Sequence, residues 1–182
     1  MEFFETEIEG VVIIESDKSL DERGTFTRLF DASGFAEQRM PAQYCQQSLS
    51  QNFKRGTLRG LHFQAAPHAE SKIVRCVCGS ILDVAVDVRP QSATFARWIS
   101  VELSAQNGRA VYLPVGIAHG FQTLADDSAV LYMIDRPYVP EAARGIAWDD
   151  PELKIAWPIR PPAMISARDR SLPSLRRAFL ST

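Results

Sequence analysis

The sequence lacks the features that mark secreted, membrane-spanning and nucleic-acid-binding proteins. Its first ten residues, MEFFETEIEG, are acidic and have neither the basic nor the apolar region of a signal peptide. No apolar run approaches the roughly 18 residues that a membrane-spanning helix needs. The net charge is −2, with no basic stripe of the kind that binds nucleic acid. We therefore expect neither membrane nor nucleic acid among its partners.

Cysteine is also scarce, with three residues in 182. Cys76 and Cys78 alternate with Val77 in an apolar run, and Cys45 is left over from any pairing. The pattern predicts that Cys76 and Cys78 are buried thiols in a reducing compartment, and hence a cytoplasmic protein.

Helical periodicity is confined to residues 31–39 and 173–180, and the dominant period is two. With 46% hydrophobic and 23% charged residues, the chain has the balance of one globular domain spanning residues 1–182. Short apolar runs separated by turns predict many strands and an all-β sandwich or jelly roll. The predicted strands are residues 10–15, 57–64, 72–78, 81–88, 98–103, 110–113, 121–124 and 130–134.

The strand at residues 81–88 carries two carboxylates in an apolar setting. Alternation places Leu82, Val84, Val86 and Val88 on one face, which we expect to belong to the core. Asp83 and Asp87 lie on the other face, where burial is costly unless each is paired. They form either structural salt bridges or a support for a lysine or arginine inside a barrel.

Three histidines, His62, His68 and His119, are the candidates for proton transfer or metal binding. His62 follows Arg59 in Leu-Arg-Gly-Leu-His-Phe-Gln, where simple alternation would place the two side chains on opposite faces. We predict a bulge at Gly60 that lets both face one pocket.

His119 ends a Pro-x-Gly-x-x-His segment that begins at Pro114, which is a cupin-type signature whose histidine often binds a metal. Metal sites of this type usually add a His-x-His pair, but Gln64 replaces the second histidine here. His68 is separated from the strand by Pro67 and is predicted to lie on a loop. We therefore expect no metal.

Seven blocks of sequence, taken in order, resemble the dTDP-4-dehydrorhamnose 3,5-epimerase family over residues 5–175. They are residues 21–24, 56–64, 72–76, 83–89, 114–121, 148–151 and 166–169. The resemblance implies a cupin-like double-stranded β-helix (a jelly roll) with short peripheral helices, and a homodimer. It also implies a nucleoside-diphosphate sugar substrate, no cofactor and no metal. The family epimerises a 4-keto-6-deoxy sugar nucleotide at the two carbons beside the ketone.

The resemblance also assigns roles. His62 is the base, held by Asp169; Tyr132 is the acid on the opposite face; and Lys72 lies at the ketone oxygen. The implied ligand contacts are Arg23, Phe26, Gln46, Ser48, Arg59, His119 and Tyr138. The residue types suit the chemistry, because a proton beside a ketone leaves an enolate and imidazole titrates near neutral pH.

Each assignment has a structural alternative. Tyr132 could be a core aromatic residue, Lys72 could extend to solvent, and Asp169 could be a solvated carboxylate. Arg23 could serve only the turn that contains it.

Three departures from the family pattern leave the substrate open. Arg28 replaces a common glutamate, Ser48 replaces an asparagine, and Pro137 precedes Tyr138 where paired tyrosines are frequent. The nucleotide base, and inversion of one carbon or both, therefore stay undecided. Alternatives are a mono-epimerase or ketoisomerase on another nucleotide, such as a cytidine sugar, and a non-catalytic binding module. Tyr132 argues against the ketoisomerase, and the missing second histidine argues against a metal-dependent oxygenase.

Overall fold

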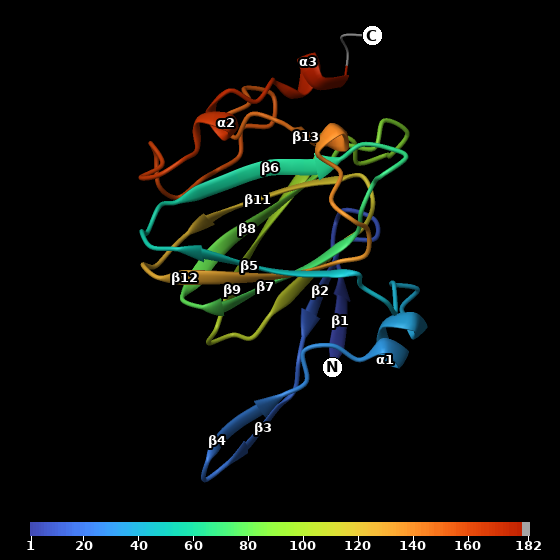
Figure 1. Cartoon of the computed structure of the whole chain (residues 1–182), viewed down its shortest axis with the longest axis vertical. Coiled ribbons are helices and arrows are strands. Elements are labelled where there is room, and N and C mark those ends of the chain that lie inside the picture. Colours follow the sequence, from blue (N-terminus) through green and yellow to red (C-terminus); the bar gives the residue numbers. More distant parts are fainter. Residues whose placement is uncertain (180–182) are drawn as a thin grey trace.

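The computed structural model describes residues 1–179 and consists mainly of two antiparallel sheets that face each other (Figure 1). The order of the six-stranded sheet is β1 (Glu2–Glu5), β2 (Val12–Glu15), β10 (Ala110–Leu113), β7 (Lys72–Cys78), β12 (Ser128–Ile134) and β5 (Gln46–Asn52). The order of the five-stranded sheet is β13 (Ala143–Gly145), β6 (Leu58–Gln64), β11 (Ile117–Thr123), β8 (Ser80–Asp87) and β9 (Trp98–Ser104). This is the predicted jelly roll.

All eight predicted strands are present within a few residues of the predicted bounds. The pattern missed β1, β5 and β13, and it missed the hairpin formed by β3 (Lys18–Asp21) and β4 (Gly24–Thr27). Most side chains of β5 are polar or exposed, so no apolar alternation marks it. Its backbone pairing with β12 makes it a strand, and the sequence pattern does not reveal that pairing.

Three apolar clusters hold the layers together. The first lies between the two sheets and includes Val74, Phe121 and Val130. The second lies on the outer face of the five-stranded sheet, where the C-terminal segment supplies Ile155 and Trp157. The third lies on the outer face of the six-stranded sheet, beneath the N-terminal helix. Each sheet is therefore packed on both faces, which holds in place the strands from which the functional side chains project.

Strand β8 is buried on both faces. Val84 and Val86 are buried, as predicted, and pack under the C-terminal segment, while Ile81 and Ala85 belong to the core between the sheets. The Asp83 and Asp87 face is therefore also interior, which is why each carboxylate has a partner. Arg89 pairs with Asp87 at 2.7 Å, in agreement with a structural salt bridge, whereas Asp83 is bonded to a histidine and to neither a lysine nor an arginine.

The cysteine prediction is right for Cys76, which is buried, and wrong for Cys78, which is exposed. Cys78 is the last residue of β7, and the pairing with β12 changes register between Ala129 and Val130. The end of the strand therefore leaves the core that covers Cys76. All three cysteines are free.

The helices are short and peripheral. The first, α1 (Ala32–Glu37), begins after Asp31, whose carboxylate accepts a hydrogen bond from the Gly34 amide at 3.1 Å. The C-terminal segment forms α2 (Ala167–Arg170), which was not predicted, and α3 (Leu175–Phe179). The last residue of the predicted tail, residue 180, lies outside the described residues. Within residues 1–179, no helix has both the length and the apolar character needed to cross a membrane.

Candidate active site

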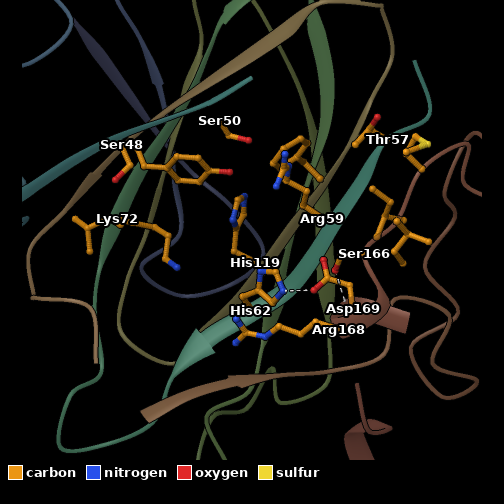
Figure 2. Close-up of a pocket in the computed structure, with 16 residues that line it drawn as sticks. Ser48, Ser50, Thr57, Arg59, His62, Lys72, His119, Ser166, Arg168 and Asp169 are labelled. Atoms are coloured by element: carbon orange, nitrogen blue, oxygen red, sulfur yellow. Dashed lines mark hydrogen bonds and ion pairs between the residues drawn. The ribbon is translucent and has the colours of Figure 1, made fainter. Parts of the chain in front are cut away.

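A cavity of about 600 Å³ opens between the sheets and is lined by side chains from β5, β6, β7, β11, β12 and the C-terminal segment (Figure 2). Seven of the residues proposed from the sequence line it. They are Ser48, Arg59, His62, Lys72, His119, Tyr132 and Asp169. One concave site therefore holds an imidazole, a phenol and an ammonium group.

The predicted bulge in β6 brings Arg59 and His62 to this cavity. His62 is paired with His119 and Arg59 with Phe121, so two residues of β6 oppose one residue of β11. Gly60 has φ +122°, and a Cβ there would lie 2.5 Å from the Gly120 Cα. Glycine is required because two backbones meet at the bulge.

His62 is held by a buried carboxylate. Its Nε2 lies 2.8 Å from the Asp169 Oδ1, and the Asp169 Oδ2 accepts a hydrogen bond from the Gly60 amide at 3.1 Å. Burial alone would raise the pKa of Asp169, but the hydrogen bonds from His62 and Gly60 lower it below its usual value. Asp169 is thus an ionised, buried partner and not a solvated side chain, and it leaves the His62 Nδ1 for the substrate.

Tyr132 projects from β12 into the cavity and also packs on the core between the sheets. Its ring meets that of His119 edge-on, with centroids 6.0 Å apart. Burial raises the pKa of the Tyr132 phenol, the Asp83 carboxylate adds to the rise, and Arg59 opposes it. The phenol is therefore protonated at neutral pH and can act as a proton donor.

Lys72 does not extend to solvent. Its side chain is 8% exposed, and its Nζ lies 2.7 Å from the Oε1 of Glu70. In Figure 2 the ammonium group lies on the opposite side of the cavity from Asp169. The site thus carries a cation that is buried and paired.

His119 forms a second histidine–carboxylate pair. Its Nε2 lies 2.7 Å from the Asp83 Oδ2, and both side chains are buried. The pair joins β11 to β8, because His119 is two residues along β11 from Phe121, which is the residue opposite Asp83. The carboxylate on β8 therefore supports a residue of the cavity, but that residue is a histidine and not the lysine or arginine of the second alternative.

Arg59 is oriented by an amide and not by a carboxylate. Its Nε donates to the Oδ1 of Asn52 at 2.7 Å, and Asn52 is fixed in turn by donating to the Ser128 carbonyl at 3.1 Å. Among residues 1–179 the outer nitrogens of this guanidinium group form no ion pair, and such nitrogens can donate to an anion.

Four proposed ligand contacts lie outside this cavity. Gln46 is two residues from Ser48 on β5 but does not line it, and Tyr138 lines a smaller neighbouring cavity that also contacts His62. Arg23 and Phe26 belong to the β3–β4 hairpin, which projects away from the sheets (Figure 1). Arg23 pairs with Asp21 of the same turn, as the structural alternative for this residue predicts. Its side chain is 85% exposed.

Sequence reasoning missed several residues of the site. The cavity is also lined by Ser50, Thr57, Met164, Ser166 and Arg168. Arg168 immediately precedes Asp169 in α2. Ser166 is the N-cap of this helix, and its hydroxyl group accepts a hydrogen bond from the Asp169 amide at 3.0 Å. The block at residues 166–169 could have signalled Arg168, because it lies beside the carboxylate that holds His62.

No cluster of three or more histidine, cysteine, aspartate or glutamate side chains able to bind a metal occurs within residues 1–179. His68 lies on the exposed loop between β6 and β7, as predicted. His62 and His119 each use Nε2 to contact a carboxylate.

Comparisons with known proteins identify the family. The family model for dTDP-4-dehydrorhamnose 3,5-epimerase matches residues 5–177. A dTDP-4-dehydrorhamnose 3,5-epimerase from Sinorhizobium fredii is 42% identical over 175 residues, which is 96% of this chain and 90% of that protein.

Solved structures give the same result. A 4-keto-6-deoxy sugar epimerase from Streptomyces spheroides has a TM-score of 0.94 and 37% identity, covering 98% of this chain and 89% of that one. A 3'-monoepimerase from Streptomyces bikiniensis in complex with dTDP-quinovose has a TM-score of 0.90 and 34% identity, covering 95% of this chain and 87% of that one. The chain therefore belongs to the dTDP-4-dehydrorhamnose 3,5-epimerase family.

Proposed function

We propose that this enzyme epimerises a 4-keto-6-deoxy nucleoside-diphosphate sugar at C3, C5 or both, without a cofactor. The observation that carries the proposal is that His62, Tyr132 and Lys72 line one cavity. They supply a base, an acid and a cation, which are the groups that proton exchange beside a ketone requires.

The reaction begins when the His62 Nδ1 takes the proton from the carbon beside the ketone. The electron pair moves to the ketone oxygen, and the Lys72 ammonium group stabilises the enolate. Asp169 fixes the proton of His62 on Nε2 and stabilises the imidazolium that forms. The Tyr132 hydroxyl group returns a proton to the opposite face, which inverts the carbon.

Arg59 and Arg168 are the cations proposed to bind the diphosphate, because both line the cavity. Thymidine is the favoured base, since the matched relatives are dTDP-sugar epimerases. Ser48 lines the same cavity and Tyr138 the neighbouring one, and we propose that these two residues influence the choice of nucleotide.

The enzyme is proposed to be a cytoplasmic homodimer in which the β3–β4 hairpin contributes to the pocket of the partner subunit. Leu20 and Phe26 on this hairpin are 77% and 73% exposed, which favours burial against a second copy. Arg23 and Phe26 would then be ligand contacts across the dimer. Three free cysteines are typical of a reducing compartment.

The second candidate is inversion of a single carbon. The similarity to a 3'-monoepimerase, whose fold this chain shares at a TM-score of 0.90, favours this alternative. Both candidates use the same base and acid, so the cavity itself does not separate them.

Incubation with 4-keto-6-deoxyglucose nucleotides in D₂O tests the proposal. NMR measures where deuterium enters the sugar. Deuterium at both C3 and C5 is the expected result for the 3,5-epimerase, and deuterium at one carbon identifies a mono-epimerase. The thymidine, cytidine, uridine and guanosine forms should be compared, because the base is part of the proposal. No exchange with any of the four would reject the enzyme and leave a sugar-nucleotide-binding module.

A further inference from the structure

The ion pair between Lys72 and Glu70 is one of the most buried in the described part of the chain. The two side chains are 8% and 9% exposed, and their charged atoms are 2.7 Å apart. Glu70 precedes β7 by two residues and lines the small cavity that adjoins the active site. A buried carboxylate is costly unless its oxygens are satisfied, so its position is a constraint on the site.

Both oxygens of Glu70 are satisfied. While Oε1 accepts from Lys72, Oε2 accepts from the Gln64 Nε2 at 2.7 Å. Gln64 is itself fixed, because its Oε1 accepts from the Val139 amide at 2.7 Å and its Nε2 also contacts the Pro137 carbonyl at 3.2 Å. The carboxylate is therefore anchored to the end of β6 and to the segment that follows β12.

We propose that Glu70 is a positioning residue that holds the Lys72 ammonium group at the ketone oxygen of the substrate. This inference rests on the proposed epimerase function. An ammonium group on a four-carbon side chain has three donors and little orientational preference of its own. One donor bonded to a fixed carboxylate leaves the other two on a defined arc facing the cavity.

The charge of Glu70 matters as well as its shape. Lys72 shares the active-site cavity with His62 on β6, His119 on β11 and Tyr132 on β12, and it pairs with Glu70 on the preceding loop. Of these, only Glu70 forms an ion pair with it among residues 1–179. A neutral replacement would leave a buried ammonium group without its counter-charge, and nothing would then hold it in a fixed position.

An ion pair that merely ties the loop to β7 is the rival explanation, and kinetic effects separate the two. Loss of a donor that bonds more strongly to the enolate than to the ketone lowers kcat and leaves KM almost unchanged. Misplacing that donor should therefore appear in kcat, whereas a structural role alters stability without that selectivity.

The test compares the Glu70→Gln variant with wild type and with Glu102→Gln, which removes an exposed carboxylate on β9. Glu70→Gln should reduce kcat for deuterium exchange by about 10–100-fold, a part of the effect of losing an oxyanion donor, with KM within about 3-fold. Glu102→Gln should match wild type. In a Lys72→Met background, adding Glu70→Gln should change the residual rate by less than about 2-fold, because Glu70 acts through Lys72.

An unchanged or increased kcat in Glu70→Gln overturns the proposal, as does an equal loss in both backgrounds. If Glu70→Gln does not fold, Glu70→Asp provides the same readout, because it keeps the charge but withdraws the carboxylate by one methylene group; wild-type kcat in that variant also overturns the proposal. Wild-type protein that shows no exchange would instead reject the epimerase function, so the two failures are distinguishable.

Discussion

His62 contacts Asp169 through Nε2, so Nδ1 is the ring nitrogen proposed to meet the substrate. His62→Ala should abolish deuterium exchange at both carbons, a loss of at least about 10²–10⁴-fold, because a positioned base contributes that much. NMR of the substrate in D₂O measures it. His68→Ala is the matched control, since His68 is exposed on a loop, and it should exchange like wild type. Exchange that survives intact in His62→Ala would reject the assignment of the base.

Tyr132 should affect the second half of the reaction. In Tyr132→Phe the base remains, so deuterium should still enter recovered substrate, while formation of the inverted product falls by roughly 10²-fold for want of a positioned acid. The ratio of deuterated substrate to product, followed by NMR, distinguishes the two steps. An equal loss of both would show that Tyr132 does not serve as the separate proton donor.

At the level of elements, the bulge in β6 carries both Arg59 and His62. Gly60→Ala should destabilise the fold by about 2–4 kcal/mol, because the added Cβ combines a strained φ with overlap against β11. Urea unfolding measures the change. Gly24→Ala is the control for φ alone, since Gly24 has φ +129° but nothing within 4 Å of an added Cβ. A loss in Gly60→Ala no larger than in Gly24→Ala would contradict the close approach of β6 to β11.

Asp87 organises the connection from β8 to β9. Burial alone would raise its pKa, but hydrogen bonds from Arg89, Ser92 and Thr94 lower it from 3.8 to about 2. A carboxyl group with a lowered pKa stabilises the folded state above its unfolded pKa, and this contribution disappears as the pH falls from about 4 towards 2.

Asp87→Asn should therefore lower the free energy of unfolding by about 2 kcal/mol or more at pH 7. The difference in this free energy between the variant and wild type should become smaller below about pH 4. Urea unfolding over the pH range in which both proteins fold tests this. Asp149→Asn, at an exposed aspartate, should show no such trend. A difference in the free energy of unfolding between wild type and Asp87→Asn that stays constant with pH would contradict the lowered pKa of Asp87.

At the level of the whole molecule, the proposed dimer makes a prediction that no single chain can meet. Arg23→Ala and His62→Ala should each be inactive or nearly so, because the hairpin and the base serve the same pocket from two subunits. Mixed in equal amounts and allowed to exchange subunits, they should recover about a quarter of the wild-type sites, since half the dimers are mixed and each has one intact site. Sedimentation should show the dimer, and no recovery after confirmed exchange would place Arg23 outside the partner pocket.

The sequence by itself determined the strands that alternate in hydrophobicity, the jelly-roll class, the family and the chemical types at the site. Local sequence pattern is enough to predict these features, because the alternation of apolar and polar residues and the order of the sequence blocks do not depend on contacts between distant segments. The same logic predicted the bulge at Gly60, where a glycine inside a strand marks a close backbone contact.

Only the tertiary structure decided which groups meet. Asp169 lies 107 residues from His62, and Asp83 reaches His119 and not a lysine or arginine. Cys78 is exposed because its strand leaves the core at its last residue, and β5 exists because β12 provides its hydrogen bonds. Burial and pairing depend on neighbours distant in sequence. For that reason the contacts of Glu70, Asn52 and Arg168 with the site could not be predicted from the sequence and are known only from the tertiary structure.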